Sequence, residues 1–395
     1  MYNISIDQNY NKEPWNIPLE ERMRILRNDL SKGLFVNMLI YEYPDTSTFS
    51  YRGYNVHRIM RGSDKWRVVY FYRHELQLLT AFIKKVKLVT VSRVKWNHDL
   101  KLFIDAVKNE GIPVAFDVDD RIYDLNYLPL VTNTLGIDFN TKPEVTYDIW
   151  FAMISRIEMT ARMADCYIGT NAFLSDALTE KFGKKGYIIP NFLNEEQLEV
   201  SSICCEEKKK QRSERPFVIG YFSGTPSHIN DFKTIYKEIL LLLCEYPDII
   251  LRVVGFMEFP KEMKKYIENG RVELVPLVDF IKLQELTACV DVNIVPLVIN
   301  SFTNCKSELK FFESAIVDTV TCAAKTFTYK NAINNGETGF LCGYSQWYST
   351  IKDIYLGKYD IDGIVNKAHL YAVEHYYGDA IIKQITNVYD EIIVD

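Results

Sequence analysis

The chain has 395 residues, of which 48% are hydrophobic and 25% are charged, and its formal net charge at pH 7 is −6. This length favours two domains, and this composition allows a large core and excludes a mainly disordered chain. The negative net charge argues against general nucleic-acid binding, which needs a basic face.

In the first half of the chain, short apolar runs alternate with longer amphipathic segments. The segment 98–111 has the pattern of a helix and ends at Gly111, a residue typical of helix ends. Such alternation predicts an α/β domain with a parallel sheet and helices on both faces. Buried strands are predicted over residues 34–43, 66–72, 87–94, 112–120 and 166–170.

The stretch 201–216, SSICCEEKKKQRSERP, is polar, dense in charge and without periodicity, and it ends in Pro. We therefore predict an N-terminal domain over 1–200 and a linker over 201–215. A second α/β domain is expected over 216–363, and the helical pattern of 364–395 could return across the junction to the first domain. Strands of the second domain are predicted over residues 216–222, 248–256, 272–278, 290–297 and 318–326.

The second domain opens with IGYFSGTPSHINDF, a predicted strand that runs into a turn and a helix. Gly224 would let a backbone approach a ligand closely, and the free N–H groups at a helix start attract phosphate or sugar oxygens. Thr225 and His228 lie where they could contact such a ligand. The alternative is an ordinary turn with Ser227 as N-cap, because the segment matches neither the Walker nor the G-x-G-x-x-G pattern.

The segment CKSELKFFESA, residues 305–315, combines lysines, glutamates and a Phe-Phe pair. We predict a helix that begins around Lys306, just past a strand, with Lys310 on the same face. Lys306 and the helix N–H groups would suit a diphosphate, and Glu313 would suit a vicinal diol such as a ribose. The alternative is a salt-bridged surface helix, although the apolar residues favour burial, where unpaired charges are costly.

Three carboxylates crowd the end of another predicted strand, in FDVDDRIYD. Asp117, Asp119 and Asp120 could bind a divalent metal, orient sugar hydroxyls or take up a proton. In an extended chain Asp117 and Asp119 point to one side and Asp120 points to the other. The alternative is a cluster of turn and capping residues.

Several features bear on location. The eight cysteines form no C-x-x-C pair, which favours reduced thiols and a cytoplasmic protein. We see no secretory signal, and no apolar run approaches the roughly 20 residues that span a bilayer. Residues 1–100 hold 16 Lys and Arg against 10 Asp and Glu, which reflects chance or an anionic partner. Residues 82–96 mix basic and apolar side chains, as in a strand with basic flanks or in a peripheral contact with the inner face of the cell membrane.

Taken in order, these pieces resemble a known family. Asn191 follows a strand and a Pro ahead of the linker, and the chain later reads NGETGFL over residues 335–341. Between them stand the strand with its Gly-containing turn, a strand ending in Pro-Leu, and the Lys/Glu helix. This order is similar to that of the GT-B glycosyltransferases, in particular the retaining family 4-type group of bacterial polysaccharide assembly. The resemblance covers most of residues 87–342 and is strongest over 217–342.

The resemblance implies two Rossmann-like domains, with a nucleotide-sugar donor held mainly by the C-terminal domain and an acceptor held mainly by the N-terminal one. In the family's E-x7-E signature, the second Glu contacts the nucleotide ribose and corresponds to Glu313. The first Glu falls on Cys305, so Glu308 is its nearest substitute. The family's Arg and Lys contacts to the diphosphate are absent here, and their role is assigned to three residues: Lys306, Thr225 and His228.

Two further positions follow from the same resemblance. Asp119 stands where many members carry a His beside the donor sugar, which implies an acidic wall there. Residues 276–279, PLVD, follow a strand, and Val278 is expected to contact the nucleotide base.

These assignments imply transfer of a sugar, with retention, to a hydroxyl of a glycan or glycoconjugate. Lys306 would stabilise the leaving diphosphate and Asp119 the positive charge on the sugar. The family needs no metal, so none is expected, and Asp117 and Asp120 are interpreted as sugar or acceptor contacts. Two alternatives stay open, a nucleotide-sugar 2-epimerase and a non-catalytic partner in a glycosyltransferase complex. A homo-oligomer is also compatible with the sequence.

Overall fold

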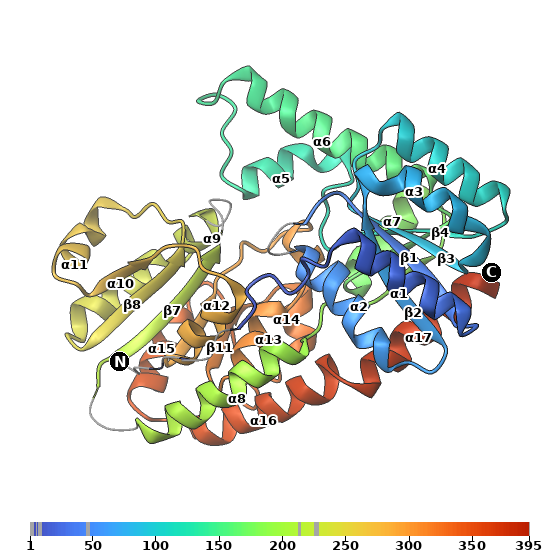
Figure 1. Ribbon diagram of the computed structural model, residues 1–395. Coiled ribbons are helices and arrows are strands. Elements are labelled where there is room, and N and C mark those ends of the chain that lie inside the picture. The colour runs from blue at the N-terminus through green and yellow to red at the C-terminus, as the bar shows by residue number, and fades with distance from the viewer. Residues whose placement is uncertain are drawn as a thin grey trace.

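The computed structural model describes residues 4, 6, 10–44, 48–211, 215–224 and 229–394. They form two α/β domains, each built on a six-stranded sheet whose neighbouring strands are parallel (Figure 1). All ten strands that we predicted from apolar runs are confirmed. The strands are β1 Phe35–Tyr41, β2 Trp66–Tyr72, β3 Leu88–Ser92, β4 Val114–Asp117, β5 Cys166–Gly169, β6 Gly186–Ile188, β7 Phe217–Gly224, β8 Ile249–Gly255, β9 Val272–Val275, β10 Val292–Val295, β11 Val320–Ala324 and β12 Phe340–Cys342.

The strand orders place the connections that matter for ligands. The N-terminal sheet runs β2-β1-β3-β4-β5-β6, and the C-terminal sheet runs β12-β11-β10-β7-β8-β9. In the second sheet the chain leaves β7 toward β8 and β9 and later returns to the other side of β7 as β10. Such a reversal opens a crevice beyond the carboxyl ends of the two central strands, where ligands bind in open α/β sheets.

Helices connect the strands and cover the sheets (Figure 1). A π-helical turn, Ser50–Tyr54, precedes α2, and short 3₁₀ turns flank several of the other helices. The α-helices are α1 Leu19–Ser31, α2 Asn55–Ile59, α3 Leu76–Leu79, α4 His98–Asn109, α5 Leu128–Thr134, α6 Glu144–Met163, α7 Ala172–Phe182, α8 Glu195–Lys210, α9 Ile229–Lys233, α10 Tyr236–Glu245, α11 Lys264–Glu268, α12 Phe280–Ala288, α13 Leu309–Ala315, α14 Phe327–Ala332, α15 Trp347–Tyr355, α16 Ile361–Tyr376 and α17 Asp379–Val394.

The segment 82–96 is a buried strand with basic flanks. Every residue of β3 is buried, and the exposed lysines Lys84, Lys85 and Lys87 stand just before it. A central strand of a covered parallel sheet is apolar on both faces, which explains why this run of sequence looked interfacial. Among the residues that the structure describes, none of the helices is both long enough and apolar enough to cross a membrane.

The stretch that we predicted as a linker, 201–215, is helical over most of its length. It belongs to α8, which begins at a capping box in which Asn194 and Gln197 each bond the other's backbone N–H. Val200, Cys204 and Lys208 recur every four residues and are all buried. This buried face of α8 was not predicted from the sequence because its third member is a lysine. In the structure the Lys208 ammonium donates to the Asp318 carbonyl at 2.8 Å.

The chain ends with two helices that lie under different domains. Helix α16 packs on α13 in the C-terminal domain, whereas α17 lies with the N-terminal domain (Figure 1). The indole of Trp66, in β2, donates to Asp390 at 2.7 Å and packs edge-on against Tyr389, with ring centroids 5.2 Å apart. Gln384 donates to the carbonyl of Ile188 at 3.2 Å. Residues 379–394 therefore stabilise the N-terminal domain.

Candidate active site

A cavity of about 120 Å³ lies between the two domains. Its N-terminal wall follows β4, and its C-terminal wall follows β10, the strand beside the chain reversal. A cleft between two α/β domains is a usual place for a ligand site. The residues that line it are Asp119, Asp120, Val295, Leu297, Lys306, Ser307, Leu309, Lys310 and Tyr329.

Two lysines, Lys306 and Lys310, line this cavity from the C-terminal domain. Lys306 does not begin a helix as we predicted: it is extended, and α13 starts three residues later, at Leu309. The Lys306 ammonium lies 4.8 Å from the centre of the Phe302 ring, and that of Lys310 lies 5.9 Å from the centre of the Tyr221 ring. Within the described part of the chain, neither ammonium forms a salt bridge. The arrangement can therefore accept an anion.

Lys310 was not among our predicted site residues. Burial lowers the pKa of Lys310 to about 8, although the nearby carboxylates of Asp231 and Glu313 act in the opposite direction. A partly buried cation of this kind gains from an anionic ligand that replaces its lost water. Its spacing of four residues from Lys306 is the signal that could have identified it.

The two carboxylates of the N-terminal wall differ in their partners. Asp119 accepts hydrogen bonds from Arg93 at 2.8 Å and from the Thr48 hydroxyl at 3.2 Å. Asp120 Oδ1 is buried and has no hydrogen-bond partner among the residues that the structure describes. Burial raises the pKa of Asp120, and the charges of Arg93 and Lys306 oppose that rise. Asp120 is thus the cavity carboxylate with an acceptor to spare, whereas the charge of Asp119 is already compensated.

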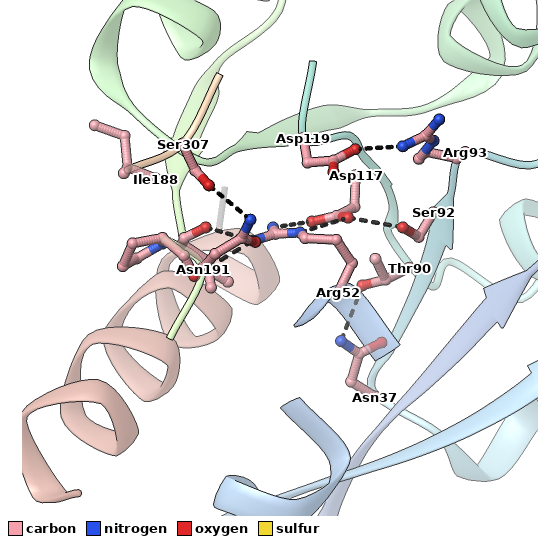
Figure 2. A network of polar contacts seen from close by, with 12 residues as sticks. Asn37, Arg52, Thr90, Ser92, Arg93, Asp117, Asp119, Ile188, Asn191 and Ser307 are labelled. Carbon is pink, nitrogen blue, oxygen red and sulfur yellow. Dashed lines mark hydrogen bonds and ion pairs between the residues drawn. The ribbon is translucent and has the colours of Figure 1, made fainter. Parts of the chain in front are cut away.

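Asp117, which we predicted as a substrate contact, is not part of the cavity lining. It is buried at the end of β4, where it forms an ion pair with Arg52 and accepts from the Ser92 hydroxyl at 2.8 Å (Figure 2). The alternation of an extended chain does not continue past the strand, so Asp117 and Asp119 have different surroundings. Its role in the structure is to hold Arg52.

Arg52 extends this polar network toward the C-terminal domain. Its guanidinium donates to the Ile189 carbonyl at 2.7 Å and to the side chain of Asn191 at 3.2 Å. Asn191 in turn donates to the Ser307 hydroxyl at 2.9 Å (Figure 2). Because Ser307 lines the cavity, the network connects the end of β4 with the site. Arg52 comes from the π-helical turn, far away in sequence, and no motif indicated it.

The two glutamates near α13 are buried and bonded to tyrosines. Glu308 accepts from the Tyr376 hydroxyl at 2.8 Å, burial raises its pKa, and it is not among the residues that line the cavity. Glu313 accepts from the Tyr51 hydroxyl of the N-terminal domain. Burial raises the pKa of Glu313 to about 7, against the effects of the Tyr51 bond and the Lys310 ammonium. Glu313 is therefore an interdomain contact beside the cavity.

The remaining predicted residues are less defined by the structure. Gly224 ends β7 with a φ of 69°, a left-handed conformation that suits glycine, and a side chain there would meet open space. Thr225 and His228 lie outside the described residues. Val278 packs beside the apolar cluster of Val218, Phe222, Val254 and Val290, and its contact with a base stays a prediction.

Comparisons with solved structures identify the architecture. HepE from Anabaena, solved with UDP, matches with a TM-score of 0.60 and 12% identity over 90% of this chain and 100% of its own. A glycosyltransferase from Rickettsia africae matches with a TM-score of 0.61 and 12% identity, over 91% of this chain and 99% of its own. A sucrose-phosphate synthase from Thermosynechococcus elongatus matches with a TM-score of 0.55 and 13% identity, over 91% and 99%. The fold is GT-B.

The GT-B fold that the order of the sequence motifs implied is confirmed by these structures, whereas comparisons of the sequence alone find no match. No protein-family model matches the chain. No curated protein matches it either. In the GT-B fold two Rossmann-like domains face each other across a cleft, and here that cleft holds Lys306, Lys310 and Asp120.

One cluster of metal-type donors lies outside the GT-B cleft. The ligand atoms of Cys205, Asp318 and His369 are within 4.8 Å of one another, and His369 Nδ1 lies 2.9 Å from Asp318 Oδ1. The ammonium of Lys208 is beside them, and burial raises the pKa of the Cys205 thiol. A neighbouring positive charge and a protonated thiol both disfavour a cation, so this cluster is better understood as a contact between α8 and α16.

Proposed function

We propose that this protein transfers a glycosyl group from a nucleoside diphosphate sugar to a hydroxyl acceptor, a glycan or glycoconjugate. The observation that carries the proposal is the pair Lys306 and Lys310. Both line the interdomain cavity, and neither has a salt bridge within the described residues. Two ammonium groups in one cavity suit a diphosphate, which carries a negative charge on each phosphate. The GT-B fold, which HepE shares and which was solved for HepE with UDP and with UDP-glucose, supports the same ligand class.

The chemistry follows from where charge develops. Cleavage of the bond between the anomeric carbon and the diphosphate leaves negative charge on the phosphate and positive charge on the sugar. Lys306 and Lys310 would stabilise the phosphate. Asp120, with its spare oxygen, would orient a sugar hydroxyl or stabilise the cationic ring, and it replaces Asp119 in our assignment because Asp119 is ion-paired.

Retention and independence of metal are part of the proposal. In the retaining mechanism that we propose, the leaving phosphate takes the proton of the acceptor, so no separate base is required, and the two lysines supply the positive charge that a metal would otherwise provide. If activity is lost with EDTA and restored by Mn²⁺, this part of the proposal is wrong.

Ligand binding tests the proposal directly. UDP-glucose, GDP-glucose and ADP-glucose should each be titrated calorimetrically into the wild type, Lys310→Met and a control, Lys264→Met, in which an exposed lysine of α11 is changed. We expect one of the sugars to bind the wild type, Lys310→Met to weaken it by about 10-fold or more, and the control to leave it unchanged.

Measurements of turnover then distinguish glycosyl transfer from the two alternatives, a non-catalytic partner and a nucleotide-sugar 2-epimerase. Binding without turnover on any acceptor would favour the non-catalytic partner. Conversion of the donor sugar in the absence of acceptor would favour the epimerase. Absence of binding by all three nucleotide sugars would contradict the proposal as a whole.

A further inference from the structure

Tyr51 and Glu313 form a hydrogen bond between the two domains, with the phenol as donor and Glu313 Oε1 as acceptor. Tyr51 belongs to the π-helical turn that precedes α2, and Glu313 belongs to α13. Each residue is only 8% exposed. The second carboxylate oxygen, Oε2, accepts no hydrogen bond from the residues that the structure describes. One half of this carboxylate is therefore held, and the other half is available.

The Tyr51 hydroxyl is itself oriented by a third residue. Gln197 Nε2 donates to the Tyr51 oxygen at 3.1 Å, and Gln197 is fixed because its own carbonyl caps the start of α8. Since the tyrosine oxygen already accepts from Gln197, its single proton is directed at Glu313. The Tyr51 ring also packs edge-on against Phe312, with centroids 6.2 Å apart. Short π-helical turns of this kind often occur at functional sites.

We propose that Tyr51 is a positioning residue for Glu313, and that its hydrogen bond fixes the carboxylate so that Oε2 can accept from the ribose of the nucleotide sugar. This inference rests on the proposed function and deepens it. It assigns a residue of the N-terminal domain to the nucleotide subsite of the C-terminal one, so that the subsite is complete only when the two domains are together.

The electrostatic surroundings of Glu313 explain why its carboxylate needs a hydrogen-bond donor. Burial raises the pKa of Glu313 to about 7, while the Tyr51 hydrogen bond and the Lys310 ammonium from α13 lower it. Burial, followed by the carboxylates of Glu308 and Glu313, raises the pKa of the Tyr329 phenol in α14, so this tyrosine also belongs to the surroundings of Glu313. A protonated carboxyl offers fewer acceptor sites to a diol than a carboxylate does. Loss of the Tyr51 bond would therefore favour the form that binds ribose poorly.

The pH dependence of binding tests this role. The glucose nucleotide that binds wild type most tightly among UDP-glucose, GDP-glucose and ADP-glucose should be titrated from pH 5.5 to 8.5. These sugars have no phosphate that titrates in this range, so the acid limb reports the protein. We expect Tyr51→Phe to move the midpoint of that limb up by about one pH unit. Compared with the wild type at the same pH, which cancels the titration of Lys310, its affinity should be reduced about 5-fold at pH 7 and largely recovered at pH 8.5.

Tyr54→Phe is the matched control. Tyr54 lies in the same π-helical turn and donates a hydrogen bond to a carboxylate, that of Glu196, at 2.6 Å. Its loss should cost similar stability but leave the midpoint of binding where it is in the wild type. A parallel measurement on Glu313→Gln, which cannot ionise, should abolish the acid limb, and this readout does not depend on how well Tyr51→Phe folds.

The outcomes separate the two proposals. If the wild type binds none of the nucleotide sugars, the proposed function is wrong. If the wild type binds with an acid limb and Tyr51→Phe keeps the same midpoint, the function stands and the role of Tyr51 is refuted. An acid limb that persists in Glu313→Gln also refutes it, because another group would then be titrating.

Discussion

The side-chain amide of Asn191 donates to the hydroxyl of Ser307 at 2.9 Å, and this bond joins the N-terminal domain to the lining of the cavity. Asn191 also accepts from Arg52, which is ion-paired with the buried Asp117. A single polar network therefore extends from the end of a strand in one sheet to the site wall of the other domain. Its members have several partners each, so changes within it affect both stability and the geometry of the site.

Ser307→Ala removes the acceptor of this bond. The variant leaves the buried Asn191 amide without that partner, and we expect the free energy of unfolding to fall by about 1–2 kcal/mol. Urea unfolding followed by circular dichroism measures the change. The control is Ser31→Ala at an exposed residue, where the hydroxyl bonds only the local Asn28 carbonyl and no measurable change is expected. Equal effects in the two variants would show that the interdomain bond contributes nothing special.

Arg52→Leu breaks the buried ion pair at the centre of the network. Arg52 is 1% exposed and Asp117 is 4% exposed, so the substitution leaves an uncompensated carboxylate in the interior. We expect a loss of about 3–5 kcal/mol in the free energy of unfolding. Arg24→Leu, which removes an exposed arginine paired with Glu21, should unfold like the wild type. A loss for Arg52→Leu below about 1 kcal/mol would contradict this account of the network.

Asp120→Asn tests the carboxylate that faces the cavity. The amide keeps the shape of the side chain and removes its charge, so it should stabilise a cationic sugar less well. We expect kcat to fall about 100-fold with little change in KM for the donor. Asp105→Asn, at a half-exposed carboxylate paired with Lys101 on α4, should keep full activity. A rise in KM at constant kcat would instead make Asp120 a binding residue for the ground state.

Glu313→Gln should change how stability depends on pH. The folded protein binds this proton with a pKa of about 7, against an ordinary value of 4.5. The stability that the protonated group contributes is fully present below pH 4.5 and is lost as the pH rises through 7. The neutral glutamine avoids that loss. Relative to wild type, the variant should gain about 2–3 kcal/mol between pH 5 and pH 8 in urea unfolding. A difference between the two proteins that is the same at both pH values would show that Glu313 titrates normally.

The strands, and the charged candidate residues that follow them, could be predicted from the sequence. Buried parallel strands are apolar on both faces, so runs such as residues 66–72 and 87–94 stood out from the helices between them. Residues that follow such strands lie at the carboxyl edge of their sheet, so Asp119 and Asp120 were predicted at the edge of one sheet and Lys306 at the edge of the other.

Helix boundaries were less predictable, because they depend on capping and packing. Helix α13 starts at Leu309 rather than at the predicted Lys306, and α8 occupies most of a stretch that we predicted as a linker. In both cases the local composition was polar, and burial against another element decided the conformation. A lysine such as Lys208 does not look like a core residue until its acceptors, distant in sequence, are known.

The sequence by itself determined two α/β halves, the positions of their strands and the residues that stand at the ends of those strands. Only the tertiary structure decided which of these residues face the cavity, because that depends on partners far away in the chain. Asp117 forms an ion pair with Arg52 away from the cavity lining, and the charge of Asp119 is compensated by an ion pair with Arg93. Tyr51 reaches Glu313 across 262 positions of sequence, and no local pattern can encode a contact that forms only when two domains fold and meet.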